Sequence, residues 1–331
     1  MPVDLNPHQD YLIREFAEEY LEAHMSRRDM MRRVLLITGS IPATAALAFT
    51  LGCGTAKDDA ARATATAGAK APASPTAAAT ATATATGTPR AAATPGVPAD
   101  DPALEAADIR FPGPAGELRG YLAKPKGAGT FPGLLIIHEN RGLLDQVKDI
   151  ARRYAKEGFV ALAIDLVSRG GGTNLQDVAL NTGFLGRANP DDLVADCLAG
   201  IAHLKALPAT QGRRLGVVGY CFGGGYTFEV AAASKDVAAA IPYYGTAQRP
   251  LEALARTSAA VLVNYGETDT RLTAQAPQVE ERLKLSGRPY RIKIYQGAGH
   301  AFFNDTGASY NPAAAADSFK EALAWFRQHL A

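Results

Sequence analysis

Hydrophobic positions from about residue 105 onward form short β-rich runs that alternate with longer amphipathic segments. The runs predict eight strands, at 109–111, 117–123, 134–138, 160–164, 215–220, 239–243, 261–265 and 290–295. Helices are predicted near 146–157, 190–207, 224–233, 274–285 and 312–328. Several strand runs are apolar at every position, as expected when helices cover both faces of a sheet. The alternation predicts an α/β fold with a doubly wound, mostly parallel sheet.

The first two predicted strands have no helix between them. They are expected to form an antiparallel hairpin at the edge of the sheet, turning at 113–116. We therefore expect one α/β domain over 105–331, which is long enough to bury a large core. The formal net charge of +1 argues against a nucleic-acid partner, which calls for a basic excess. Three cysteines in 331 residues argue against a disulfide scaffold.

The chain before this domain has a different pattern. A basic segment at 26–33 contains the adjacent Arg27 and Arg28, and an apolar run follows at 34–51. A basic region, an apolar run and small residues after it are typical of an export signal. The arginine pair resembles a twin-arginine signal, which is read by a receptor. The alternative is an uncleaved membrane anchor, although about 18 apolar positions are at the short limit for spanning.

Cys53 lies where a bacterial lipoprotein carries its lipidated cysteine, in the segment Leu-Gly-Cys-Gly. The alternative is cleavage after Ala48 and release of a free exported domain. Residues 10–24 alternate acidic and apolar positions at helical spacing and could be removed with the signal. We assign 1–53 to the signal and 54–104 to a disordered linker of Ala, Thr and Pro, which lacks the apolar side chains a core needs. The protein is expected outside the cytoplasm.

The strongest chemical motif is Gly-Tyr-Cys-Phe-Gly at 219–223. It follows an apolar strand and precedes a helix, as in the nucleophile elbow G-x-S-x-G with cysteine in place of serine. The sharp turn needs small residues on both sides of Cys221. It presents the thiol at a helix N-terminus, where the positive end of the helix dipole favours a thiolate. The alternative is a buried structural cysteine beside a glycine-rich turn.

A thiolate nucleophile needs a base, and the base needs an acid to orient it. In α/β-hydrolases the chain order is nucleophile, acid, histidine. Asp269 and His300 follow Cys221 in this order, each in a loop after a predicted strand. Glu267 is the competing acid, and His329 is the other histidine beyond Cys221, on the terminal helix.

On these residues, the region 105–331 resembles the dienelactone hydrolase (carboxymethylenebutenolidase) family, α/β-hydrolases with a Cys-Asp-His triad. The resemblance extends to Ile-Ile-His-Glu-Asn-Arg-Gly at 136–142. It implies that Glu139 contacts the resting thiol and accepts its proton. The alternative is an ion pair between Glu139 and Arg141. The resemblance also implies an oxyanion hole formed by the backbone N–H groups of Phe222 and Asn140.

The segment Asp-Leu-Val-Ser-Arg at 165–169 resembles the family segment whose arginine binds the substrate carboxylate, which makes Arg169 a candidate for this role. Asn304 departs from the family, which has a second arginine a few residues after the catalytic histidine.

Cys197 is expected in the core. We expect no cofactor and no metal site, since no His, Cys and carboxylate residues have metal-ligand spacing.

The sequence thus predicts a monomeric hydrolase of a small ester or lactone, held at the membrane through a lipid on Cys53. A thioesterase or another acyl hydrolase on the same triad is the first alternative. A catalytically silent binding domain on the cell surface is the second.

Overall fold

The computed structural model describes residues 5–21, 25–53, 96–246 and 251–331, so most of the predicted linker lies outside the described residues. Eight strands form one sheet in the order β1-β2-β4-β3-β5-β6-β7-β8. The strands are β1 (Leu104–Gly113), β2 (Gly116–Pro125), β3 (Gly133–Ile137), β4 (Val160–Asp165), β5 (Leu215–Tyr220), β6 (Val237–Tyr243), β7 (Ala260–Gly266) and β8 (Tyr290–Tyr295). The β1–β2 hairpin is antiparallel and joins β4 antiparallel, while β3 to β8 run parallel. The predicted fold class and edge hairpin are confirmed.

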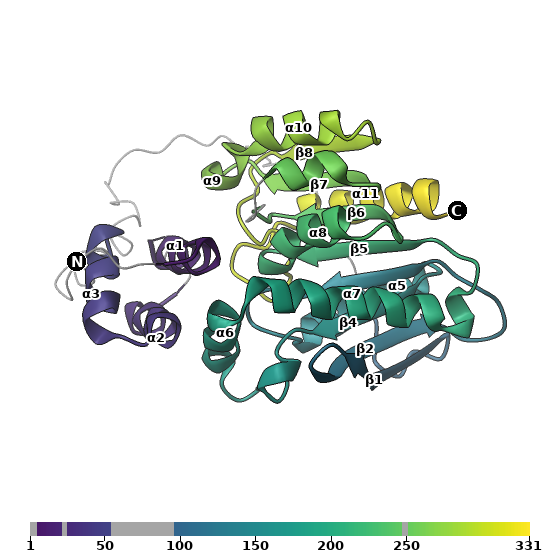
Figure 1. Cartoon of the computed structure of the whole chain (residues 1–331), viewed down its shortest axis with the longest axis horizontal. Helices are drawn as coiled ribbons and strands as arrows, with labels where there is room; N and C mark the ends of the chain where they lie inside the picture. Colours follow the sequence, from purple (N-terminus) through teal and green to yellow (C-terminus); the bar gives the residue numbers. More distant parts are fainter. Residues whose placement is uncertain (1–4, 22–24, 54–95, 247–250) are drawn as a thin grey trace, which may run out of the picture.

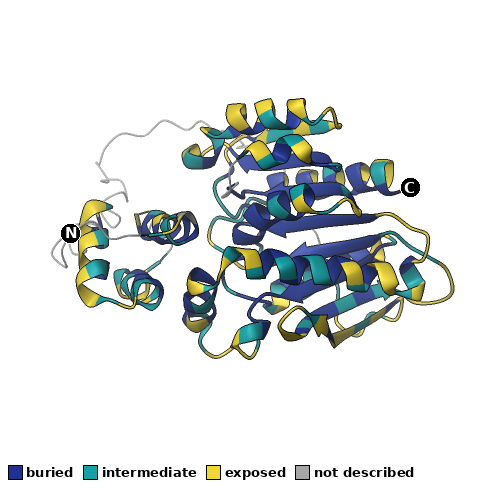
Figure 2. Ribbon diagram, in the orientation of Figure 1, coloured by how far each residue is buried: buried dark blue, intermediate teal, exposed yellow. Residues whose placement is uncertain are grey.

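The central strands are buried along their whole length. Every residue of β3, β4, β5 and β7 is buried, so helices must cover both faces (Figure 2). One face packs against α7 (Pro190–Ala206) and α8 (Phe222–Ala233). The other packs against α5 (Asp145–Lys156) and α11 (Pro312–Leu330). Because helices cover both faces, functional side chains can gather only at the ends of the strands, in the loops that follow them.

Shorter elements complete the domain. α9 (Thr270–Thr273) and α10 (Ala276–Leu285) follow β7, and α6 (Val178–Arg187) precedes α7. Single turns of 3-10 helix lie at Ser168–Gly170 and Pro208–Thr210, and a longer one at Leu251–Arg256. The sequence pattern did not predict α6, because glycines at two of its ten positions interrupt the helical signal.

The folded domain begins before the predicted boundary at residue 105. Val97 donates its backbone N–H to Asp149 of α5 at 2.6 Å and accepts from Arg152. Lys156 pairs with Asp101 at 2.9 Å. Residues 96–103 therefore pack on the α/β domain, and β1 starts at Leu104.

Three N-terminal helices lie together beside α6, at the end of the sheet where the parallel strands finish (Figure 1). They are α1 (Pro7–Leu21), α2 (Arg27–Thr38) and α3 (Ile41–Thr50). The apolar run at 34–51 is not one helix, because Gly39 takes a left-handed φ of 64° and ends α2, and Ser40 caps α3. Within the described residues, no helix has both the length and the apolar character needed to cross a membrane.

The contact of α5 with α11 offers a test of the core. Phe326 is fully buried and packs its ring 5.9 Å from Tyr154 and 6.0 Å from Phe159. Phe326→Ala should lower the free energy of unfolding by about 3–5 kcal/mol, because it removes a ring and leaves a cavity. Denaturant unfolding measures the loss. The exposed Gln328→Ala on the same helix should stay within about 0.5 kcal/mol, and an equally small loss at Phe326 would contradict this packing.

Candidate active site

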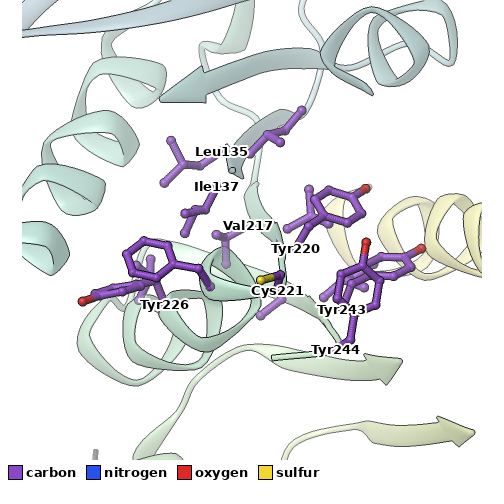
Figure 3. Packing of buried hydrophobic residues seen from close by; sticks show 14 of the residues in the cluster. Leu135, Ile137, Val217, Tyr220, Cys221, Tyr226, Tyr243 and Tyr244 are labelled. Carbon is purple, nitrogen blue, oxygen red and sulfur yellow. The ribbon is translucent and has the colours of Figure 1, made fainter. Parts of the chain in front are cut away.

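Cys221 sits in a sharp turn between β5 and α8. Its φ of 55° and ψ of −117° are unusual for a residue with a Cβ. The turn is possible because glycines pack directly on backbone: a Cβ at Gly219 would lie 2.1 Å from the carbonyl oxygen of Gly223. A Cβ at Gly223 would lie 2.3 Å from the carbonyl oxygen of Ile137 in β3. Figure 3 shows the Cys221 sulfur among the buried side chains of this region.

The Asp269 and His300 side chains meet beside this turn. Asp269 follows β7 and His300 follows β8, and the His300 Nδ1 lies 2.7 Å from the Asp269 Oδ2. Glu267 is exposed and instead accepts the backbone N–H of Gly297 at 2.8 Å. His329 lies on α11 against Trp325. Of the two acids considered from the sequence, the structure brings Asp269 to His300.

A third group completes the centre, and it comes from the N-terminal helix α1. The Cys221 Sγ donates to the Glu15 Oε1 at 2.9 Å, and Asn140 donates its side-chain N–H to the same oxygen at 3.0 Å. The His300 Nε2 lies 3.7 Å from this oxygen. The reactive atoms of Glu15, Cys221 and His300 all lie within 4.8 Å of one another.

From the sequence, residues 10–24 have helical spacing, but no role at the site could be assigned to them. The available signal was that Tyr11, Glu15 and Glu19 repeat every fourth residue beside the apolar Leu12 and Phe16. A carboxylate in the apolar stripe of a helix must find a buried partner. Glu15 and Phe16 are 2% and 0% exposed, so the stripe is indeed buried. The partner of Glu15 lies 206 residues further along the chain, which no local pattern can indicate.

The electrostatics of the centre follow from burial and from these carboxylates. Burial, followed by the charge of Glu15, raises the pKa of the Cys221 thiol to about 12. Burial acts to lower the pKa of His300, but the carboxylates of Glu15 and Asp269 outweigh it and raise that pKa well above its usual value. Burial acts to raise the pKa of Asp269, but the charge and hydrogen bond of His300 lower it. With α1 in place, the thiol is therefore held protonated, despite the helix dipole of α8.

The centre opens on a cavity of about 330 Å³ whose walls include α1. Two arginines on its wall face carboxylates of that helix. Arg271 pairs with Glu18 at 3.0 Å, and Arg141 with Glu19 at 3.4 Å. Both of these arginines are thus paired with side chains of α1.

Glu139 also lines the cavity, but its contact is with Asn304, which donates to the Glu139 Oε2 at 2.8 Å. Burial raises the pKa of Glu139. The hydrogen bond of the thiol goes to Glu15, so the contact with the resting thiol that the resemblance implied for Glu139 is made by another carboxylate. Asn304, which replaces the family arginine, holds Glu139 in place.

The two residues expected to supply the oxyanion hole follow the adjacent strands β3 and β5. Asn140 follows β3 and lines the cavity, and Phe222 is the first residue of α8. The first amides of a helix have no partner inside it, so the Phe222 N–H is suited to this role. The role of both amides stays a prediction.

Arg169 is not brought to the cavity. Its guanidinium forms two hydrogen bonds of 2.8 Å with the buried Asp196 and pairs with Asp192 at 3.1 Å. A substrate carboxylate there would have to displace this ion pair with the buried Asp196.

Cys197 is fully buried beside Asp196, as expected of a core residue. Cys53 is 1% exposed at the end of α3.

Glu15, Cys221 and His300 offer donor atoms of the kind that bind zinc, although their distance in sequence gave no metal-ligand spacing. Ligands at 2.0–2.3 Å from a tetrahedral ion stand about 3.5 Å apart. The 2.9 Å between the Cys221 Sγ and the Glu15 Oε1 instead matches a hydrogen bond. Cys221 and Glu15 are therefore hydrogen-bonded to each other, while the His300 Nε2 lies 3.7 Å from the Glu15 Oε1.

The mixed sheet, the flanking helices and the elbow after β5 define an α/β-hydrolase. Comparison with known proteins identifies the family. The model of the "Dienelactone hydrolase family" matches residues 118–330. The chain belongs to this family and is a dienelactone hydrolase-like hydrolase.

Individual relatives agree with this placement. A Methylorubrum extorquens protein named "Putative carboxymethylenebutenolidase" is 31% identical over 252 residues, 72% of this chain and 86% of the relative. A Bradyrhizobium protein named "Probable 2-oxo-3-(5-oxofuran-2-ylidene)propanoate lactonase" is 29% identical over 230 residues, 66% of this chain and 92% of the relative. The crystal structure of a "Putative Dienelactone Hydrolase" from Klebsiella pneumoniae has a TM-score of 0.62 at 26% identity and covers 69% of this chain and 100% of its own.

The carboxylates around His300 predict its titration. Glu15→Gln removes a negative charge 3.7 Å from the His300 Nε2, so the pKa of His300 should fall. Asp269→Asn should lower it too. Histidine Cε1–H resonances followed by NMR against pH measure the change, and Asp10→Asn, in the exposed pair with Arg14, is the control. An unchanged His300 titration in Glu15→Gln would contradict the contact.

The raised pKa of His300 also predicts how the free energy of unfolding depends on pH. The raised pKa of His300 in the folded protein stabilises the fold fully below about pH 6.5, its value in an unfolded chain. This contribution is lost as pH rises through the folded-state pKa. The effect of Glu15→Gln on unfolding free energy should therefore be larger at pH 6 than above the folded-state pKa of His300.

Proposed function

We propose that this hydrolase cleaves a carboxylic ester or lactone through a covalent intermediate on Cys221, with His300 as base and Asp269 as the group that orients it. The observation that carries the proposal is the meeting of the three side chains at the ends of β5, β7 and β8. The Asp269–His300 contact of 2.7 Å fixes the ring, and a ring nitrogen lies within 4.8 Å of the Cys221 Sγ.

The first half of the reaction is acyl transfer to sulfur. His300 takes the proton of the Cys221 thiol, and the thiolate adds to the substrate carbonyl carbon. The negative charge that develops on the carbonyl oxygen is stabilised by the amides of Phe222 and Asn140. The carbon–oxygen bond of the ester or lactone then breaks, and His300 gives its proton to the departing oxygen.

The second half releases the acid. His300 takes a proton from a water molecule, whose oxygen adds to the thioester carbon of the acyl-enzyme. The carbon–sulfur bond breaks, Cys221 leaves as the thiolate or thiol, and the carboxylic acid departs. In both halves Asp269 holds the imidazole in one orientation and stabilises its protonated form.

The substrate class follows from the cavity and the family. Arg141 and Arg271 lie beside the centre and suit an acidic small molecule when they are not paired with Glu19 and Glu18. The names of the relatives include carboxymethylenebutenolidase and lactonase, which agree with a lactone or ester. Arg169 has a lesser claim to the substrate, because it is bonded to Asp196.

We also propose that residues 1–53 act as an export signal and that Cys53 can carry a lipid. The support is the sequence pattern: Arg27 and Arg28, the apolar run at 34–51 and the cysteine that ends it. In this fold Arg28 is exposed, whereas Cys53 is buried. Processing at Cys53 would therefore require the N-terminal helices to leave their present position.

Loss of the nucleophile tests the proposed reaction. Cys221→Ala should lower kcat/KM for 4-nitrophenyl acetate and for a lactone such as dihydrocoumarin by about 10³-fold or more. Cys197→Ala removes a buried thiol away from the site and is the matched control. Full turnover in the Cys221→Ala variant would contradict the mechanism. Faster cleavage of acyl thioesters than of all esters and lactones would make the protein a thioesterase on the same triad.

Fractionation of producing cells tests export. The full chain should yield a mature form outside the cytoplasm, and Arg27→Lys/Arg28→Lys should hold the precursor inside. Mass spectrometry of the mature N-terminus should find a lipid-modified Cys53, and Cys53→Ala should remove it. Cleavage after Ala48 without lipid would support a free exported domain. Unprocessed protein from both the full chain and the Arg27→Lys/Arg28→Lys variant would contradict the export signal.

A further inference from the structure

Helix α1 occupies the position that a substrate needs. A carbonyl carbon must approach the Cys221 Sγ to about 3–3.5 Å for attack. The Glu15 Oε1 lies 2.9 Å from that sulfur, and the Tyr11 hydroxyl oxygen lies 3.8 Å from it. Cys221 is only 3% exposed. Substrate and α1 therefore cannot occupy the centre together.

The contacts of α1 match the catalytic domain in charge as well as in shape. Glu15 accepts from Cys221 and Asn140. One turn further along, Glu18 and Glu19 pair with Arg271 and Arg141, the two cavity arginines. The Arg271 guanidinium also lies 5.0 Å from the centre of the Tyr11 ring. Three successive carboxylates of one helix thus meet Cys221 and both cavity arginines.

The second N-terminal helix holds this arrangement from outside the cavity. α2 packs on α6, where a Cβ at Gly186 would lie 2.6 Å from the Ile37 side chain and one at Gly183 would lie 2.7 Å from Leu36. Glycine in a helix interior costs about 1 kcal/mol relative to alanine, so two in one short helix favour a packing role. Leu12 of α1 reaches the same Gly186 position. The α6 surface therefore fits the N-terminal helices closely.

We infer that α1 is an internal inhibitor: the catalytic centre is closed while the N-terminal helices are docked and opens when they leave. The inference rests on the proposed function, since it takes Cys221 as the nucleophile. Docking and opening form a two-state equilibrium, and the observed rate scales with the open fraction. The carboxylate of Glu15 also keeps the thiol protonated, which reinforces the steric block.

The inhibiting segment is the one assigned to the export signal. A precursor with α1 docked would be closed, and removal of the segment during processing would open the site. Activity would then appear only after transfer out of the cytoplasm.

The test uses the full chain with single substitutions in the N-terminal helices. Leu12→Asp places a charge in the contact of α1 with α6. Ile37→Asp does the same in the contact of α2 with α6, and Ile37 is not among the residues that line the cavity. The controls are Asp10→Asn, in an exposed pair of α1, and Ile41→Asp, the same exchange at a residue that is 73% exposed. Two rates are measured: alkylation of Cys221 by iodoacetamide, located by peptide mass spectrometry, and kcat/KM for 4-nitrophenyl acetate.

Both rates should rise at least about tenfold in Leu12→Asp and Ile37→Asp, as the open fraction grows, and stay within about twofold in the controls. Circular dichroism of each variant checks that the domain stays folded. The Klebsiella structure supports the expectation that the domain folds without the N-terminal helices, because its whole chain corresponds to 69% of this chain. Having two variants at separate contacts keeps the test decisive if one misfolds.

The outcomes separate this inference from the proposed function. Faster alkylation without any ester cleavage would support the internal inhibitor and contradict the proposed hydrolysis. Rapid alkylation and full hydrolysis in the unmodified chain, unchanged in both variants, would overturn the internal inhibitor and leave the hydrolase intact.

Discussion

The turn at Cys221 is the constraint on which the rest of the structure depends. A residue with a Cβ holds a φ of 55° there because the elements around it leave no other path. The glycines before and after it let β5, β3 and the start of α8 approach to backbone contact. A larger residue at Gly219 or Gly223 would separate these elements and move the thiol. The cost of the strained turn, about 1–3 kcal/mol, is offset by the buried sheet around it.

A thiol fixed in this way responds to what stands beside it. In the proposed reaction, His300 and Asp269 are the neighbours of the thiol, and one proton moves between the Cys221 sulfur and the imidazole. With the Glu15 carboxylate added, the same proton is held on the thiol and the imidazole is held protonated. The N-terminal helix therefore changes both the access to the centre and its protonation, and a single contact at 2.9 Å links the two effects.

The parts of the fold that depend on local pattern could be predicted from the sequence. The apolar runs predicted all eight strands, although β1 begins at Leu104 and not at the predicted 109. The elbow motif located Cys221 between β5 and α8. The loop positions of Asp269 and His300 predicted a meeting that the 2.7 Å contact matches. Contacts between distant segments could not be predicted. Arg169 resembles a substrate-binding residue, but its bond to Asp196 depends on how α7 packs. The sequence pattern around Glu15 indicates an amphipathic helix, but the contact of Glu15 with Cys221 depends on where that helix docks.

Trapping of the acyl-enzyme tests the central claim most directly. Leu12→Asp and the unmodified chain are mixed with 4-nitrophenyl acetate, quenched with acid within seconds and mapped by peptide mass spectrometry. We expect an acetyl group on Cys221 of Leu12→Asp, with none on Cys53 or Cys197, and much less acetylation of Cys221 in the unmodified chain. Equal acetylation of Cys221 in both proteins, or acetyl groups on other residues while Cys221 stays free, would contradict it.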